Sequence, residues 1–170
     1  MKNSKHQHFS NKIFKLQDRQ RLQRMTNYWS FKNQTLVFTN GCFDILHRGH
    51  VDGLARAAEL GDVLLVGLNT DQSVKRLKGQ QRPLNKEEDR AMLLAGLSFV
   101  SAVVLFDEDT PRELIQAIKP NILVKGSDYS QEEIAGADLV RAHGGQVVSL
   151  PLLPGYSTTS LIHKIKKLPD

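Results

Sequence analysis

The sequence predicts an α/β domain of three layers (α/β/α), in which a doubly wound parallel sheet is covered by helices on both faces. Short apolar runs of Val, Ile and Leu alternate along the chain with segments of helical period. Strands of this composition, separated by helices of about ten residues, are typical of parallel sheets buried on both sides. Because such sheets bind ligands at the carboxyl ends of their strands, we expect functional residues directly after the strands.

The individual elements can be placed from residue 35 onward. Strands are predicted at residues 36–38, 63–68, 99–106, 122–125 and 147–150. Helices are predicted at residues 51–60, 86–97, 111–119, 131–143 and 157–166. Asn85 is the expected N-cap of the second of these helices, Thr110 with Pro111 begins the third, and Gly144 ends the fourth.

Residues 1–34 are predicted to be a basic, partly helical N-terminal extension, followed by the main domain at residues 35–170. The extension holds eight basic residues and one acid, a net charge of +7, which leaves −2 for the domain. The spacing of its apolar residues suits an amphipathic helix that includes Ile13, Leu16, Leu22, Met25 and Trp29, after a mobile tail of ten residues. A slightly acidic domain binds polyanions poorly, so no nucleic acid partner is expected.

Composition indicates a soluble cytoplasmic protein. The chain has 170 residues, 40% of them hydrophobic and 24% charged, which is ordinary for one globular domain. No apolar run approaches the roughly 18 residues of a membrane span, and the first residues contain no apolar stretch suited to secretion. The single cysteine, Cys42, cannot form an intramolecular disulfide, so nothing indicates an oxidising compartment.

The segment TNGCFDILHRGH, residues 39–50, joins the first of these strands to the first helix. Its small polar residues and glycine allow backbone N–H groups to approach phosphate oxygens, and the helix dipole adds to this attraction. His47 and His50 lie on one side of the first helical turn. They fit a metal pair poorly, because the HExxH pattern is absent. Two donors to phosphate, or one capping and one exposed histidine, remain about equally supported by the motif alone.

The whole pattern resembles the HxGH nucleotidylyltransferase superfamily, in its cytidylyltransferase-like group, over about residues 35–166. It is most similar to the adenylyltransferase domain that acts on D-glycero-β-D-manno-heptose 1-phosphate. The similar segments are residues 69–71 (NTD), 74–79 (VKRLKG), 82–85 (RPLN) with 89–90 (DR), 123–129 (LVKGSDY), 133–136 (EIAG) and 155–159 (GYSTT). The resemblance implies a Rossmann-like nucleotidyltransferase fold. In some bacteria this domain follows a sugar kinase, for which 34 residues are too few, so a stand-alone form is expected.

This resemblance implies transfer of AMP from ATP to the heptose 1-phosphate, giving ADP-heptose and pyrophosphate for lipopolysaccharide or surface-glycan synthesis. It implies Mg²⁺ held mainly by the ATP phosphates, no metal site of the protein's own, no membrane partner, and a homodimer. One alternative is a cytidylyltransferase that acts on glycerol 3-phosphate or a similar alcohol phosphate. A more remote alternative is a non-catalytic nucleic-acid-binding protein that uses the basic extension.

The residues expected to carry the reaction follow from the motif and the resemblance. The catalytic candidates are Thr39, His47, His50 and Lys78. The nucleotide-binding candidates are Thr39, Asn40, Gly41, Cys42, Phe43, Asp44, His47, Gly49, His50, Lys125, Gly126, Asp128, Tyr156, Ser157, Thr158 and Thr159. The candidates for the phosphate of the second substrate are Lys75, Arg82 and Arg90, of which Arg90 is either phosphate-facing or structural.

Several of these residues have a second interpretation. Residues 75–82 are expected in a basic loop that closes over phosphates, although a solvated loop is the alternative for Lys75. The hydroxyl residues 157–159 fit a plain helix cap as well as a phosphate site. Residues 126 and 128 are also common in turns, and Cys42 fits a small buried residue without a chemical role.

Overall fold

The computed structural model describes residues 4–126 and 134–168, and within these ranges six strands form one parallel sheet. The strands are β1 (Ile13–Lys15), β2 (Leu36–Gly41), β3 (Val63–Asn69), β4 (Ala102–Phe106), β5 (Ile122–Gly126) and β6 (Gln146–Leu150). Their order is β1-β4-β3-β2-β5-β6, and all the pairs are parallel. The chain moves outward from β2 through β3 to β4 and then returns to the other side of β2. This topology confirms the predicted doubly wound sheet.

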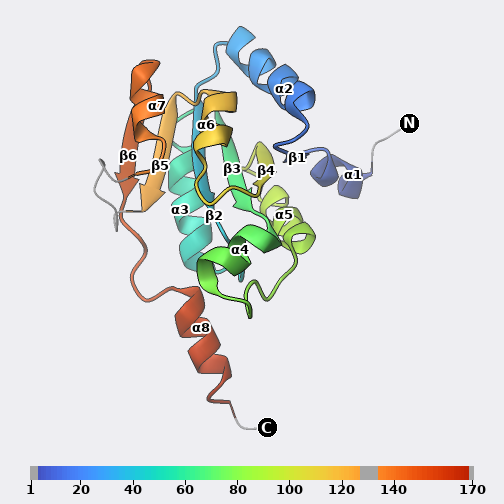
Figure 1. Ribbon diagram of the computed structural model, residues 1–170, viewed down its shortest axis with the longest axis vertical. Helices are drawn as coiled ribbons and strands as arrows, with labels where there is room; N and C mark the ends of the chain where they lie inside the picture. Colours follow the sequence, from blue (N-terminus) through green and yellow to red (C-terminus); the bar gives the residue numbers. More distant parts are fainter. Residues whose placement is uncertain (1–3, 127–133, 169–170) are drawn as a thin grey trace.

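Helices cover both faces of the sheet (Figure 1). The helices are α1 (Lys5–Ser10), α2 (Arg19–Phe31), α3 (Arg48–Ala58), α4 (Asp71–Lys78), α5 (Glu87–Ala95), α6 (Arg112–Ile118), α7 (Ala137–Ala142) and α8 (Thr158–Ile165). One face carries α2, α6 and α7, and the other carries α3 and α5. The last helix, α8, extends beyond the carboxyl ends of the strands (Figure 1). None of the helices in the described part of the chain is long and apolar enough to span a bilayer.

Two apolar cores form because successive side chains of a strand point to opposite faces of the sheet. Every residue of β3 is buried. Leu65 belongs to the core beneath α2, α6 and α7, whereas Leu64 and Val66 belong to the core beneath α3 and α5. Polar side chains interrupt this pattern only at the carboxyl ends of the central strands, as at Asn40 and Asn69. The sheet therefore presents its polar groups along the edge where a ligand is expected.

The N-terminal segment differs from the amphipathic helix predicted for it. Leu22, Met25 and Trp29 do lie on α2, but Ile13 belongs to β1 and Leu16 follows that strand in the core. The helix starts late because Asp18 is its N-cap, with a carboxylate oxygen that accepts from the backbone N–H of Arg21 at 3.2 Å. The residues before this cap instead pair with β4, which would otherwise be an edge strand.

Residues 4–10 are not the free tail that was expected, because α1 begins at Lys5 and Phe9 packs against the core beneath α5; residues 1–3 lie outside the described ranges. Lys12 fastens the next turn: its ammonium group donates to the carbonyl of Ala95 at 3.2 Å and to that of Val100 at 2.8 Å. Burial lowers the pKa of this ammonium group. A division of the chain at residue 34 stays a prediction.

Other element boundaries also moved. Residues 75–78, expected in a loop, belong to α4, because the Thr70 hydroxyl accepts from the Ser73 N–H and begins a helix there. Lys86 rather than Asn85 is the N-cap residue of α5. The third predicted strand begins at Ala102 instead of residue 99. The fourth predicted helix is shorter, since α7 follows Gly136, whose φ of 88° lies in the left-handed region; residues 131–133 lie outside the described ranges.

The burial of Leu16 predicts that the N-terminal segment stabilises the whole sheet. We expect Leu16→Ala to lower the free energy of unfolding by about 2–5 kcal/mol, because the side chain is 1% exposed and its removal leaves a cavity. Urea unfolding followed by circular dichroism measures the change. Phe31→Ala is the matched control, since Phe31 is 82% exposed and its loss should change stability by about 0.5 kcal/mol or less. Equal effects of the two substitutions would contradict the prediction.

Candidate functional site

A cavity of about 600 Å³ opens at the carboxyl ends of β2, β3 and β5. It lies where the strand order reverses, between β2 and β5, which is the usual ligand position in a doubly wound sheet. The predicted site residues that line it are Asn40, Gly41, Cys42, Phe43, Asp44, His50, Lys78, Arg82, Lys125, Gly126, Thr158 and Thr159. The fold thus brings together residues from four separate parts of the sequence.

The two histidines stand as a stacked pair at the start of α3. Their ring centroids are 3.7 Å apart and their planes differ by 15°. His47 is the N-cap residue of α3, and its Nδ1 accepts from the backbone N–H of His50 at 3.3 Å. Since Nδ1 is an acceptor, the proton of neutral His47 must be on Nε2, which can donate to a ligand. Capping and ligand binding are therefore compatible roles for one imidazole.

Burial keeps both imidazoles neutral. The pKa of His50 falls to about 4, chiefly because the ring is desolvated and also because His47 is adjacent, while the Ile45 backbone opposes the shift. Burial also lowers the pKa of His47. Among the described residues, Nδ1 of His50 is buried and has no hydrogen-bond partner. A neutral pair at a helix N-terminus retains N–H groups that can donate to an anion without mutual charge repulsion.

Packing requires a glycine at position 49, and a role of Gly49 in nucleotide binding stays a prediction. A Cβ atom at this position would lie 2.8 Å from Cβ of Tyr156 and 3.2 Å from the ring of His47. Tyr156 is also held by Arg48, whose Nη1 donates to the phenol oxygen at 3.3 Å. The close approach places the turn before α8 directly against the start of α3.

A second cavity, of about 420 Å³, lies between that turn and the first turn of α3. Of the predicted site residues, His47, Tyr156 and Ser157 line it. Because His50 lines the larger cavity, the stacked pair separates the two spaces. The sequence motif predicted two histidines that face one ligand, whereas the structure gives each histidine a different environment.

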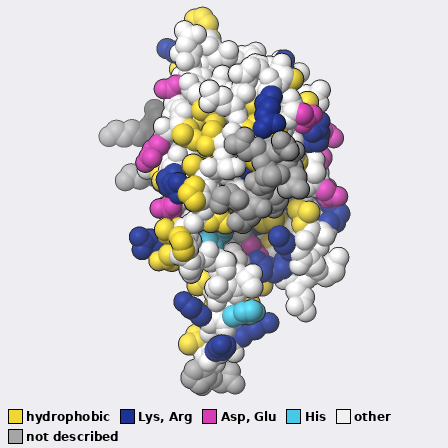
Figure 2. All heavy atoms as spheres, turned by 90° about the vertical axis from the view of Figure 1, so that its left-hand side faces the viewer, with side chains coloured by type: hydrophobic (Ala, Val, Ile, Leu, Met, Phe, Trp, Pro, Cys, Tyr) yellow, Lys and Arg dark blue, Asp and Glu magenta, His cyan; other side chains and the backbone are white. Residues whose placement is uncertain are grey.

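The hydroxyl residues before α8 divide their roles. Ser157 is the N-cap residue, and its Oγ accepts from the backbone N–H of Ser160 at 3.0 Å. Thr158 and Thr159 line the larger cavity. One hydroxyl suffices for the cap, so the other two can bind a ligand. Basic side chains gather along α8 itself, at the lower end of the molecule in Figure 2.

Asp44 organises the loop that follows α4. Its carboxylate is 2% exposed and accepts from Nε of Arg82 at 2.5 Å. The backbone N–H groups of Leu84 and Asn85 donate to the same carboxylate at 2.7 and 3.0 Å, and the Asn85 amide donates to the Asp44 carbonyl at 2.6 Å. Asp44 therefore positions Arg82 at the cavity wall and leaves the rest of the guanidinium available.

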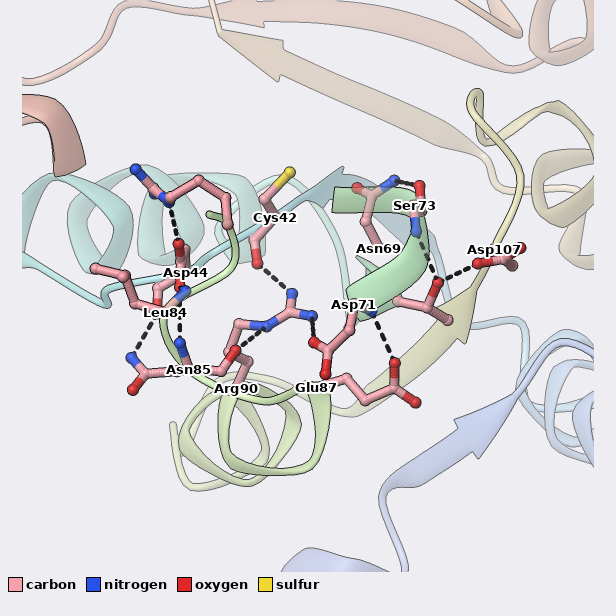
Figure 3. A network of polar contacts seen from close by, with 12 residues as sticks. Cys42, Asp44, Asn69, Asp71, Ser73, Leu84, Asn85, Glu87, Arg90 and Asp107 are labelled. Atoms are coloured by element: carbon pink, nitrogen blue, oxygen red, sulfur yellow. Dashed lines mark hydrogen bonds and ion pairs between the residues drawn. The ribbon is translucent and has the colours of Figure 1, made fainter. Parts of the chain in front are cut away.

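Arg90 is a structural residue, which is the second of its two predicted roles. Its side chain is completely buried, and its donors reach the carbonyl of Asn85 at 3.0 Å, the carbonyl of Cys42 at 2.5 Å and the carboxylate of Asp71 at 2.8 Å. Figure 3 shows the guanidinium between these three groups. Arg90 is not among the residues that line the cavity, so it supports the segment after β2 from behind.

Lys125 and Cys42 both line the larger cavity. Burial lowers the pKa of the Lys125 ammonium group to about 8, and the nearby Cys42 opposes this shift. Burial raises the pKa of the Cys42 thiol, although the positive charges of Lys78 and Arg90 partly offset this effect. The thiol is therefore protonated at neutral pH, in agreement with a packing role.

The remaining candidates stand apart from the larger cavity. Thr39 is half-buried within β2, and Lys75 is exposed on α4. Asp128 lies outside the described residues. Conversely, sequence reasoning gave no binding role to Asn69, Asp109 and Thr110, which line the cavity. Their positions directly after β3 and after β4 were the available signal, because that edge of the sheet was expected to bind the ligand.

Comparison with known proteins agrees with the family resemblance of the sequence. Residues 38–164 match the family model described as cytidylyltransferase-like. The bifunctional protein HldE of Campylobacter concisus is 59% identical over 131 residues, which cover 77% of this chain and 27% of that protein. HldE of Caulobacter vibrioides is 52% identical over 151 residues, which cover 89% and 31%. The chain thus spans less than a third of the length of these relatives.

Two solved structures are similar. The lipopolysaccharide core biosynthesis protein of Thermoplasma volcanium has a TM-score of 0.58 and 29% identity, and the match covers 71% of this chain and 97% of that one. Pantoate-β-alanine ligase of Francisella tularensis has a TM-score of 0.60 at 17% identity, covering 91% and 77%, and shares the fold alone. The family match spans most of the sheet together with the histidine motif and α8, so the chain belongs to the cytidylyltransferase-like family.

Proposed function

We propose that the chain is an adenylyltransferase that transfers AMP from ATP to D-glycero-β-D-manno-heptose 1-phosphate, with release of pyrophosphate. The observation that carries this proposal is the stacked histidine pair beside a cavity at the strand-order reversal. The heptose substrate is supported by the resemblance of residues 123–129 and 155–159 to the heptose branch, and by the similarity to HldE. A homodimer stays an expectation of the resemblance.

The proposed reaction is an in-line displacement at the α-phosphorus of ATP. An oxygen of the heptose phosphate forms the new bond to phosphorus, and the bond to the bridging oxygen of pyrophosphate breaks. The attacking phosphate is already ionised, so the step needs no general base. Catalysis then depends on position and on stabilisation of the charge that develops on the phosphates.

The structure offers donors for this charge from two helix starts. In the proposal, Nε2–H of His47 and the ring of His50 donate to phosphate oxygens, and Thr158 and Thr159 bind from the start of α8. Lys78 and Arg82, on the opposite wall of the cavity, attract the phosphate of the sugar. Lys125 and Gly126, at the end of β5, take the nucleoside side, since they lie across β2 from Lys78.

Mg²⁺ enters the proposal with the nucleotide. As the resemblance implies, we assign the ATP phosphates as its main ligands. When bound, the ion neutralises charge on the triphosphate.

The function is tested by following pyrophosphate release with ATP or CTP against a panel of acceptors. We expect turnover with ATP and the heptose 1-phosphate, and much slower turnover with CTP and glycerol 3-phosphate. A preference for CTP and glycerol 3-phosphate would support a cytidylyltransferase instead. Salt-dependent binding of nucleic acid without turnover would contradict both enzymatic proposals.

The two histidines give a second prediction. We expect His47→Ala and His50→Ala each to lower kcat by about 100-fold or more, the scale for losing one preorganised donor. His6→Ala is the control, because His6 is exposed on α1. Circular dichroism should show folded protein in all three variants. Unchanged turnover in both site variants would rule out the proposed role.

The low pKa of His50 gives a third prediction, on stability. The folded protein keeps His50 neutral down to about pH 4, whereas the unfolded chain binds a proton near its ordinary pKa of 6.5. The unfolded state therefore binds more protons in this window, so the free energy of unfolding should fall as pH drops from about 6.5 to 4. Urea unfolding across this range should show a shallower dependence for His50→Gln. An NMR titration that gave His50 a pKa near 6.5 would contradict the prediction.

A further inference from the structure

The cavity continues beyond the nucleotide side toward β3 and β4. There it is lined by Asn69, Val74, Leu77, Lys78, Asp109 and Thr110. In the proposed function the nucleotide occupies the β2 and β5 side, so this part is left for the second substrate. It holds Lys78, which attracts an anion, together with amide, carboxylate and hydroxyl groups that suit a hydroxylated molecule.

Asn69 is oriented by its neighbours on α4 and after β4. The Ser73 hydroxyl donates to the Glu108 carbonyl at 3.3 Å, so the same hydroxyl can only accept from Asn69. The Nδ2 group of Asn69 supplies that hydrogen bond, at 3.0 Å (Figure 3). The carbonyl oxygen Oδ1 is then the end of the amide that faces away from Ser73, and the residue lines the cavity although it is only 3% exposed.

The position of Ser73 is itself held in place. Its N–H donates to the Thr70 hydroxyl at 3.2 Å, and that hydroxyl donates to the carboxylate of Asp107. The chain of hydrogen bonds joins the start of α4 to the segment after β4. Because Asn69 is buried among groups that accept only one orientation of its amide, its oxygen is a preorganised acceptor.

A second asparagine lies on the same face of the sheet. Asn40 pairs with Gly67, and a Cβ atom on Gly67 would lie 3.0 Å from Cβ of Asn40. Gly67 and Asn69 are two residues apart on β3 and therefore share a face. Oδ1 of Asn40 is buried without a partner among the described residues, and Asn40 also lines the cavity. One buried amide oxygen on this wall, Oδ1 of Asn40, thus lacks a donor among the described residues, and Asn69 lines the cavity beside it.

An amide oxygen on a cavity wall can accept a hydrogen bond from a donor that the ligand supplies. The hydroxyl groups of a sugar are such donors. We propose that Asn69 determines acceptor specificity: its Oδ1 accepts a hydrogen bond from a hydroxyl group of the sugar phosphate, and Ser73 is a positioning residue that fixes the amide. This inference rests on the proposed function and adds to it the part of the site that recognises a polyhydroxylated acceptor.

The test compares the heptose 1-phosphate with analogues that each lack one hydroxyl group, using ATP as donor. The variants are Asn69→Ala, Asn69→Asp and Ser73→Ala, with Asn27→Ala on the exposed side of α2 as the matched control. The readout is the ratio of kcat/KM between parent and analogue within each variant. This ratio does not depend on the fraction of folded enzyme, so partial unfolding of a variant cannot imitate the result.

We expect the wild type and Asn27→Ala to lose roughly tenfold in kcat/KM for one analogue, the scale of one hydrogen bond. Asn69→Ala should show no further loss for that analogue, while its KM for ATP stays unchanged. Ser73→Ala should reduce the discrimination, because the amide can then turn. Asn69→Asp should keep part of it, because a carboxylate also accepts from a hydroxyl.

Two results would overturn the inference. One is full discrimination by Asn69→Ala against every analogue, and the other is a raised KM for ATP in place of the acceptor effect. Both leave the proposed function intact, since the wild type is active in them. A wild type that turns over no sugar phosphate with any nucleotide would remove the proposed function and this inference together.

Discussion

The guanidinium group of Arg90 joins three segments on which the candidate site is built. It binds the carbonyl of Cys42 directly after β2, the carbonyl of Asn85 before α5, and the carboxylate of Asp71 at the start of α4. A buried cation without partners is strongly unfavourable, so the segments around it must keep the positions that supply them. These hydrogen bonds therefore restrict the motion of the loop that lines the cavity.

Asp44 completes this arrangement from the cavity side. Its buried carboxylate gathers Arg82 and two backbone N–H groups of the loop that follows α4. Asp44 thus binds this short segment, residues 82–85, along its length, and Arg90 adds a hydrogen bond to its last carbonyl, that of Asn85. With the segment fixed, the positive charge of Arg82 can be aimed at an anion without a large loss of conformational freedom on binding.

The histidine pair uses a different principle. Burial removes the positive charge from both rings, and capping by His47 determines which of its nitrogens carries the proton. Two neutral rings can stack at 3.7 Å, whereas two imidazolium cations would repel each other at this distance. The same glycine that allows this packing, Gly49, also lets Tyr156 bring the start of α8 against the pair. One short motif therefore serves the stack, the helix cap and the contact between distant segments.

Sequence was sufficient wherever a local pattern has one physical solution. The apolar strands, the parallel sheet and the Ser157 cap follow from periodicity and from hydrogen bonding within a few residues. The same local reasoning wrongly placed Ile13 and Leu16 in a helix. This segment instead pairs with β4, whose edge would otherwise be free. It also failed at residues 75–78. Their basic side chains suggested a loop, but the Thr70 cap begins a helix that includes them.

The sequence by itself thus determined the class of fold, the edge of the sheet where the cavity opens, and the residues of the histidine motif. Only the tertiary structure decided that Arg90 is buried behind the site, that each histidine lines a different cavity, and that Asn69 lines the larger cavity with its amide nitrogen bound to Ser73. The reason is that these properties depend on partners far away in the chain, 48 positions for Arg90 and Cys42 and 108 for Arg48 and Tyr156. Local periodicity carries no record of such partners, whereas the burial of a polar group obliges the fold to supply them.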